Sequence, residues 1–284
     1  MSASTSVADS GDQSIAKPSY KYRYYYNNNG SSTTTNTIVV LLLVGTAMSA
    51  SDYANLGQQT VAQNKARGGG GVIFCVVDHN PGSWYNPGGA VKLSGQKAAQ
   101  ALNDLVQHLS ERLTLASLSS SPSIFIGGHS AGGSAVIDAM MHSLLNFPPQ
   151  GYIGVDPYGT QPFKPASNIS KKHIDIPTLA FGFTATTCAV QVNEAGKAAY
   201  QVSPHTDRAL VQIQNPKNGH QITHCIFTDH GCGRSVCPSH SQGAWVRQVA
   251  GGCIAVFVSK SHASYESIVG DHPVNLFQNS DVVA

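Results

Sequence analysis

The feature that most constrains the fold is a series of short apolar runs that alternate with longer stretches of helical periodicity. Each run has the length of a strand and lacks polar alternation, which is typical of strands buried on both faces. Alternating strands and helices predict an α/β fold with a mostly parallel central sheet flanked by helices on both faces. The predicted strands are 37–44, 72–78, 123–127, 152–155, 177–183 and 223–228, and the predicted helices are 51–63, 95–113, 131–145 and 242–259.

Composition divides the chain near residue 37. Residues 1–36 are rich in Ser, Thr and Asn, and they offer too little apolar surface to offset the entropy of ordering the backbone. We expect a disordered or loosely attached tail there, with at most one edge strand near residues 22–26. Residues 37–284 show no internal repeat and no second shift in composition, so they are predicted to form a single domain.

Charge and hydropathy exclude several functions. Lys and Arg number 17 against 15 Asp and Glu, and a net charge of +2 gives no electrostatic reason to expect nucleic acid as a partner. The longest apolar run spans 38–44, far short of the roughly 20 residues that cross a bilayer. No apolar segment of a secretory signal follows the first residue. We therefore expect a soluble protein.

The six cysteines leave the compartment open. Three of them lie in apolar runs and are predicted to be small buried residues: Cys75, Cys225 and Cys253. Cys232 and Cys237 lie in a loop rich in Gly, Pro and Ser, where they could pair with each other or with Cys188. The chain has no CxxC pair, so we expect no zinc site.

The stretch 124–133, IFIGGHSAGG, carries the clearest chemical signal. It contains Gly128-x-Ser130-x-Gly132 between an apolar strand and a helical pattern. A serine hydroxyl is a poor nucleophile until a base removes its proton, so it must project where an imidazole can reach it. A strained strand-to-helix turn with small neighbours presents a serine in this way. We predict that Ser130 is a nucleophile; the alternative is a glycine-rich turn with a solvated serine.

An oxyanion that forms at such a serine needs backbone N–H donors. The helix after Ser130 supplies the N–H of Ala131 together with the positive end of its dipole. A second donor is expected from the loop after the first core strand, where Gly45 permits a turn. Thr46 is the predicted donor and Ala47 the alternative, unless Gly45 is an ordinary strand-ending glycine.

The remaining residues of a catalytic triad are expected in the order Ser, Asp or Glu, His. Asp156 ends the strand that follows Ser130 in sequence, and the carboxyl ends of parallel strands are where catalytic groups gather. It is the predicted acid, which would orient the imidazole. Asp175 is the alternative, but it precedes a strand.

The base is expected just after the last core strand and before the closing helix. If that strand is 223–228, this position selects His230. His240, in the loop that leads to the last helix, is the alternative. His224 lies inside the predicted strand, so we expect it to be a hydrogen-bonded core residue.

With these segments placed, residues 37–260 resemble the chlorophyllases, a branch of the α/β-hydrolase superfamily. The resemblance rests on VVLLLVG, GHSAGG, GVDPYG, HCIFTDHGCG and AGGCIAVFV. It implies an α/β-hydrolase fold with the nucleophile at Ser130 and the acid at Asp156. Two positions depart from the family: Ala131 stands where the family has Arg, and Cys232 aligns with the family histidine while His230 takes the tyrosine position.

The resemblance implies a serine carboxylic-ester hydrolase that converts chlorophyll to chlorophyllide and phytol through an acyl-enzyme. No metal or organic cofactor is expected, and segments 80–95 and 158–174 are expected to form the pocket rim. A general carboxylesterase, a lipase-type enzyme or a polyester hydrolase is the alternative enzyme. A non-catalytic binding protein on a hydrolase scaffold is a further alternative, because of Cys232. A chlorophyllase would be expected in the plastid, and the other enzymes in the cytoplasm.

Overall fold

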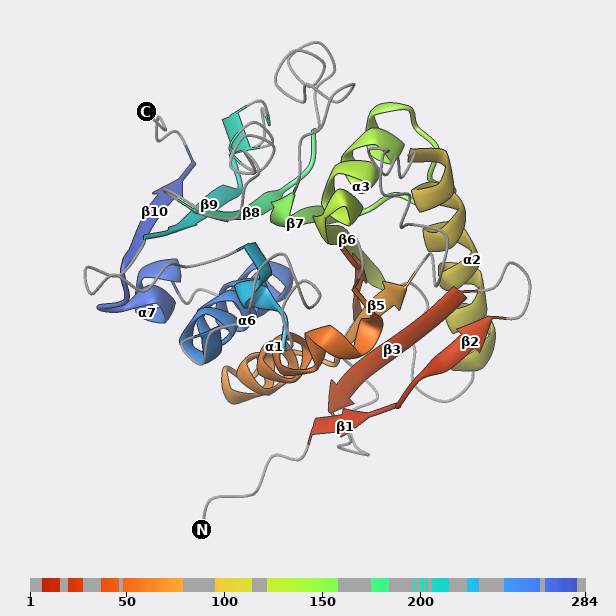
Figure 1. Cartoon of the computed structure of the whole chain (residues 1–284), viewed down its shortest axis with the longest axis horizontal. Helices are drawn as coiled ribbons and strands as arrows, with labels where there is room; N and C mark the ends of the chain where they lie inside the picture. Colours follow the sequence, from red (N-terminus) through yellow and green to blue (C-terminus); the bar gives the residue numbers. More distant parts are fainter. Residues whose placement is uncertain are drawn as a thin grey trace.

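The computed structural model describes residues 7–15, 20–27, 37–45, 48–78, 95–113, 122–157, 175–183, 197, 200, 201, 203, 206–214, 224–229, 243–260 and 264–279. Within these ranges the chain forms one sheet of ten strands with helices on both faces (Figure 1). The predicted α/β architecture with a mostly parallel central sheet is confirmed.

Six parallel strands make up the middle of the sheet, in the spatial order β5-β4-β6-β7-β8-β9. Their register places Leu41 between Cys75 on one side and Ile126 on the other. Wholly buried β-branched and leucine side chains explain why the central strands carry no polar alternation. The strands are β4 (Ile38–Leu43), β5 (Val72–Asp78), β6 (Ser123–Ser130), β7 (Gly151–Pro157), β8 (Thr178–Phe183) and β9 (Arg208–Ile213).

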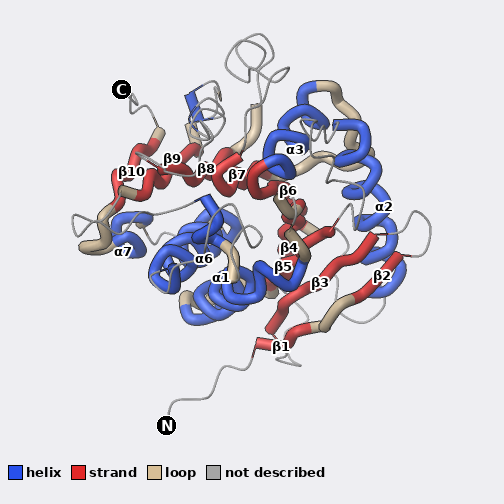
Figure 2. The backbone as a smooth tube through the Cα atoms, viewed as in Figure 1, coloured by secondary structure: helices blue, strands red, loops and turns tan. Residues whose placement is uncertain are grey.

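The helices form two layers, one on each face of the sheet (Figure 2). The first layer holds α1 (Ala54–Ala66), α6 (Gly243–Ser259) and α7 (Tyr265–Val269), and a short 3₁₀ helix, η1 (Ala50–Tyr53), leads into α1. The second layer holds α2 (Gly95–Leu113) and α3 (Ala131–Met141). The four predicted helices are confirmed, and the predicted bounds of α2 agree with the structure at both ends.

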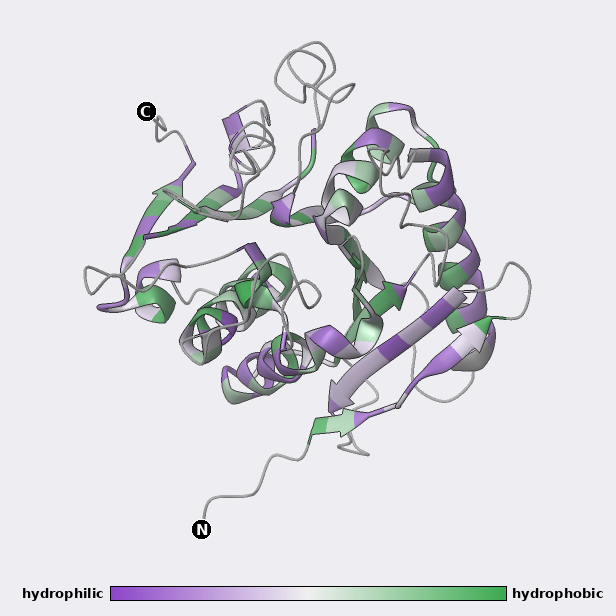
Figure 3. Ribbon diagram, in the orientation of Figure 1, coloured by the Kyte–Doolittle hydropathy of each residue, from purple (hydrophilic) through white to green (hydrophobic). Residues whose placement is uncertain are grey.

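Alternate strand residues pack against the two helical layers. Leu42 belongs to the apolar cluster shared with α1 and α6, and its neighbour Leu41 belongs to the cluster shared with α2 and α3. Figure 3 shows hydrophobic residues along the inner strands and α6, whereas α1 and α2 carry many hydrophilic residues. No helix among the residues described is both long and apolar enough to cross a membrane.

Part of the N-terminal segment belongs to the sheet, so the prediction of a disordered or loosely attached tail at 1–36 was wrong for these residues. β3 (Tyr20–Asn27) pairs antiparallel with β5, and β1 (Val7–Asp9) and β2 (Gln13–Ile15) pair with β3. The strand expected near 22–26 is confirmed, but it is not an edge strand, because β1 and β2 pair with the side of β3 that faces away from β5. Buried tyrosine rings on β3 supply the apolar surface that a count of aliphatic residues misses.

The sixth parallel strand is β9, and the prediction of a strand at 223–228 was wrong. The run His224–Phe227 instead forms a 3₁₀ helix, η2, that is buried between the sheet and α6. The ring centroid of Phe227 lies 5.8 Å from that of Phe181 and 5.6 Å from that of Phe183. The apolar character of η2 therefore reflects packing on the sheet rather than pairing within it. At the far edge, β10 (Val274–Gln278) pairs antiparallel with β9.

Candidate active site

Ser130 is the last residue of β6 and immediately precedes α3. Its backbone has φ 53° and ψ −126°, which residues other than glycine rarely adopt and which costs conformational energy. The residue is 8% exposed. The predicted strand–turn–helix with a strained serine is therefore present, and Ser130 lies at the carboxyl edge of the parallel sheet.

Two glycines allow the backbones around Ser130 to approach one another. A methyl group on Gly128 would lie 2.5 Å from the carbonyl carbon of Gly132, across the strand-to-helix turn. A methyl group on Gly132 would lie 2.4 Å from the carbonyl oxygen of Val44. Both distances are far below a van der Waals contact, so these two positions require glycine, as predicted.

Gly45, in the loop after β4, lies close to the serine. A methyl group on Gly45 would lie 3.1 Å from Ser130 Cβ and 2.9 Å from Met48 Sδ. This contact agrees with the prediction that the segment beginning at Gly45 faces the nucleophile. Thr46 and Ala47, the expected and alternative oxyanion donors, lie outside the described residues. Ala131 is the first residue of α3, where backbone N–H groups have no helical partner.

Asp156 lies near the carboxyl end of β7, the strand beside β6. The register places Ser130 opposite Pro157, so the serine and Asp156 share one sheet edge. Asp156 Oδ2 lies 2.5 Å from His224 Nδ1. A carboxylate can only accept, so Nδ1 of His224 donates and Nε2 keeps its lone pair. Burial raises the pKa of Asp156, and the adjacent His224 opposes that shift.

His224 is therefore the imidazole that the structure brings to Asp156. It begins η2, its side chain is 12% exposed, and its ring centroid lies 4.5 Å from that of His129, the residue before Ser130. The expectation of a hydrogen bond at His224 is confirmed, but its placement inside a core strand was wrong. His230 and His240, the predicted and alternative bases, lie outside the described residues.

Buried polar contacts hold η2 in place. Arg247 of α6 donates from Nη1 to the carbonyl oxygens of Ile226 and Thr228, at 3.0 Å each. The same guanidinium forms an ion pair with Asp229, whose other carboxyl oxygen accepts from the N–H of Asn55 in α1. Because the contacts come from two helices, they fix the backbone that carries His224.

Cys225, the neighbour of His224, is disulfide-bonded. The prediction that it is a small buried residue is confirmed, whereas its disulfide was not predicted. Cys75 and Cys253 are buried, as predicted, and both are free thiols. Burial raises the pKa of both thiols, which keeps them protonated and unreactive at neutral pH.

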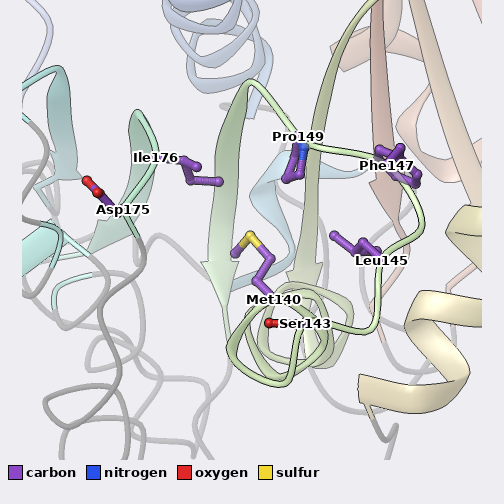
Figure 4. A pocket seen from close by; sticks show the side chains of 7 residues that line it. All are labelled: Met140, Ser143, Leu145, Phe147, Pro149, Asp175 and Ile176. Carbon is purple, nitrogen blue, oxygen red and sulfur yellow. The ribbon is translucent and has the colours of Figure 1, made fainter.

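Asp175, the alternative acid, lies at the opposite edge of the sheet from Ser130. It lines a cavity of about 260 Å³ near the starts of β7 and β8, together with the end of α3 (Figure 4). In a parallel sheet the strand starts and the strand ends lie on opposite edges, so Asp175 is far from the carboxyl end of β6. The cavity is lined by Met140, Ser143, Leu145, Phe147, Pro149, Asp175 and Ile176.

Comparisons with known proteins do not assign the chain to a family: no protein-family model matches it, and neither does any curated protein. The chemistry of the site is therefore argued from its geometry. At one sheet edge the described residues hold a strained serine, a buried carboxyl group and an imidazole hydrogen-bonded to that carboxyl group. These are the groups that nucleophilic acyl transfer requires.

Proposed function

We propose that the protein is a serine carboxylic-ester hydrolase with an α/β-hydrolase fold. Ser130 is the nucleophile, His224 the general base and Asp156 the residue that orients the base. The observation that carries this proposal is the 2.5 Å contact between His224 Nδ1 and Asp156 Oδ2, at the edge where Ser130 adopts its strained conformation. In this proposal His224 takes the role that was predicted for His230.

In the first half of the reaction, Nε2 of His224 removes the proton of the Ser130 hydroxyl while Oγ bonds to the ester carbonyl carbon. The carbonyl electron pair moves to its oxygen, and the N–H of Ala131 stabilises the charge with a second donor from the loop that follows Gly45. In this proposal that donor is Thr46. Asp156 stabilises the imidazolium and stays ionised.

In the second half, the tetrahedral intermediate collapses and the ester C–O bond breaks. The alcohol leaves with the proton that His224 received, and an acyl-enzyme remains on Ser130. Water then attacks this acyl group with His224 again as base, and collapse releases the carboxylic acid and restores the serine. Every proton moves between Ser130, His224, substrate and water, so the proposed reaction requires no cofactor.

The first substrate class to test is an ester with a large apolar alcohol. The motifs GHSAGG and GVDPYG resemble those of chlorophyllases, so chlorophyll, with chlorophyllide and phytol as products, is the proposed substrate. The low share of charged residues, 11%, is consistent with an apolar ligand. Incubation with chlorophyll a should release chlorophyllide; turnover of short p-nitrophenyl esters alone would instead define a general carboxylesterase.

Active-site labelling tests the enzyme class directly. A fluorophosphonate probe should modify Ser130, identified by peptide mass spectrometry, and Ser130→Ala should abolish both labelling and ester turnover. Ser123→Ala, at the other end of β6, is the matched control and should keep both. Absence of labelling in a folded protein that turns over no ester would contradict the proposal and favour a binding protein on the same scaffold.

A further inference from the structure

A second histidine lies beside the base of the proposed site, next to the nucleophile in sequence. His129 precedes Ser130, is completely buried, and stacks on His224 with ring centroids 4.5 Å apart and planes tilted by 32°. The mechanism above assigns it no step. Both ring nitrogens of a buried imidazole need hydrogen-bond partners. The partner of each nitrogen therefore indicates the tautomer of the ring and its role.

The partners of His129 define its protonation state. Nε2 lies 3.1 Å from the backbone carbonyl oxygen of His224, which can only accept, so Nε2 carries a hydrogen and donates. Burial, and then the proximity of His224, lowers the pKa of His129 well below its usual value, so the ring is neutral near pH 7. Nδ1 of a neutral ring with a protonated Nε2 is an acceptor.

Tyr53 supplies the hydrogen that Nδ1 accepts. Its hydroxyl oxygen lies 2.7 Å from His129 Nδ1, and burial raises the pKa of this phenol well above its usual value, so it stays protonated. Met48 Sδ lies 2.7 Å from the same hydroxyl and 3.1 Å from Nδ1. A thioether is a weak acceptor, so the imidazole nitrogen receives the Tyr53 hydrogen.

The chain of hydrogen bonds continues to the loop after β4. The N–H of Gly45 donates to the Tyr53 hydroxyl oxygen at 3.0 Å. Donation therefore runs in one direction, from Gly45 to Tyr53, from Tyr53 to His129, and from His129 to the carbonyl of His224. One end of this chain lies in the loop that faces Ser130, and the other lies on the backbone of the base.

We propose that Tyr53 and His129 are positioning residues. They hold Gly45, where the loop after β4 begins (the oxyanion loop), and the general base in fixed relation to Ser130. This inference rests on the proposed ester hydrolysis and adds two residues that do not touch the reacting atoms. Without the Tyr53 hydroxyl, His129 has no donor at Nδ1 and can take the other tautomer, which presents a lone pair to the His224 carbonyl. Gly45 then also loses its acceptor.

Tyr53→Phe tests this role by removing one oxygen atom. Tyr22→Phe is a matched control, because the Tyr22 hydroxyl lies 2.9 Å from His108 Nε2 with rings in a similar edge-on arrangement. Tyr22 lies on β3, which is separated from β6 by β5 and β4, and His108 lies on α2. Both substitutions remove a buried tyrosine hydroxyl that contacts a histidine ring nitrogen. Only Tyr53→Phe changes a residue of the proposed site.

Two measurements separate positioning from a purely structural role. With a p-nitrophenyl ester, Tyr53→Phe should lower kcat by about 10- to 100-fold with little change in KM, whereas Tyr22→Phe should keep kcat within about twofold. Nitrogen NMR of the histidine rings should show His129 as the neutral Nε2–H tautomer from pH 5.5 to 8 in the wild type, and a loss of that single state in Tyr53→Phe.

An unchanged kcat in Tyr53→Phe, beside wild-type turnover that depends on Ser130, would overturn this inference and leave the proposed function standing. A wild-type His129 that titrates near pH 6.5 or carries its hydrogen on Nδ1 would also overturn it. Wild-type protein that turns over no ester and resists the fluorophosphonate would instead overturn the proposed function, and the positioning role with it.

Discussion

His224 Nδ1 and Asp156 Oδ2 lie 2.5 Å apart, although 68 residues separate them along the chain. The carboxyl group is at the end of a buried parallel strand, and the imidazole begins a 3₁₀ helix that Arg247 ties to α6. The pair therefore depends on two separate parts of the fold that meet at one edge of the sheet.

Replacing the carboxylate should change the tautomer of the His224 imidazole. In Asp156→Asn, an amide N–H facing Nδ1 would favour the tautomer with hydrogen on Nε2, which cannot accept the serine proton. We expect kcat for a p-nitrophenyl ester to fall by about 10³- to 10⁴-fold with KM little changed. Kinetics on variant protein with an unaltered circular dichroism spectrum provides the check; a fall below tenfold would argue against the assigned role of Asp156.

Gly45→Ala should disturb the oxyanion loop. The added methyl group would lie 2.9 Å from Met48 Sδ and 3.1 Å from Ser130 Cβ, so the loop must shift away from the serine. We expect kcat to fall by about tenfold or more, because small displacements at a reacting centre are costly. Gly182→Ala is the control, since a methyl group there meets no atom within 4 Å. Equal kcat values for the two variants would refute this expectation.

Arg247 should contribute to stability through its contacts to η2. Arg247→Met leaves the carbonyls of Ile226 and Thr228 without their donor and Asp229 without its cation. We expect the free energy of unfolding to fall by about 2–4 kcal/mol in urea titrations. Arg23→Met breaks a more exposed pair with Asp9 and should cost less than about 1 kcal/mol. A smaller loss for Arg247→Met than for Arg23→Met would contradict this explanation.

The depressed pKa of His129 should make stability depend on pH. The folded state excludes a proton that the unfolded chain binds below a pKa of 6.5, so falling pH favours unfolding. His224, Tyr53 and Met48 face the ring. His129→Gln should flatten the dependence of the unfolding free energy between pH 7.5 and 5.5, by up to about 1.4 kcal/mol per pH unit. Parallel curves for wild type and variant would contradict it.

Local patterns predict much of the fold. The apolar stripe of α2 predicts that helix at both ends, because alanine and leucine at helical spacing define one buried face. The central strands follow from their unbroken apolar runs, and the glycines around Ser130 predict the tight turn that the structure has. These features depend on neighbouring residues in the sequence, so they can be read without knowledge of tertiary contacts.

The imidazole partner of Asp156 could not be predicted in the same way. The run HCIF has the composition of a strand, but it forms η2 because Phe227 packs on phenylalanines of β8. The true last parallel strand, Arg208–Ile213, carries Arg and Gln and has a weaker apolar pattern. If the base is sought after that strand, the next histidines in the sequence are His220 and His224. Only the tertiary contact with Asp156 selects His224.

The identity of the general base tests the account most directly. We predict that His224→Ala lowers kcat for ester hydrolysis by at least about 1,000-fold, whereas His230→Ala and His240→Ala each stay within about tenfold of the wild type. The three variants should be compared at equal folded concentration, with Ser130 labelling measured alongside. A His224→Ala protein that retains wild-type kcat, while His230→Ala or His240→Ala loses it, would contradict the site described above.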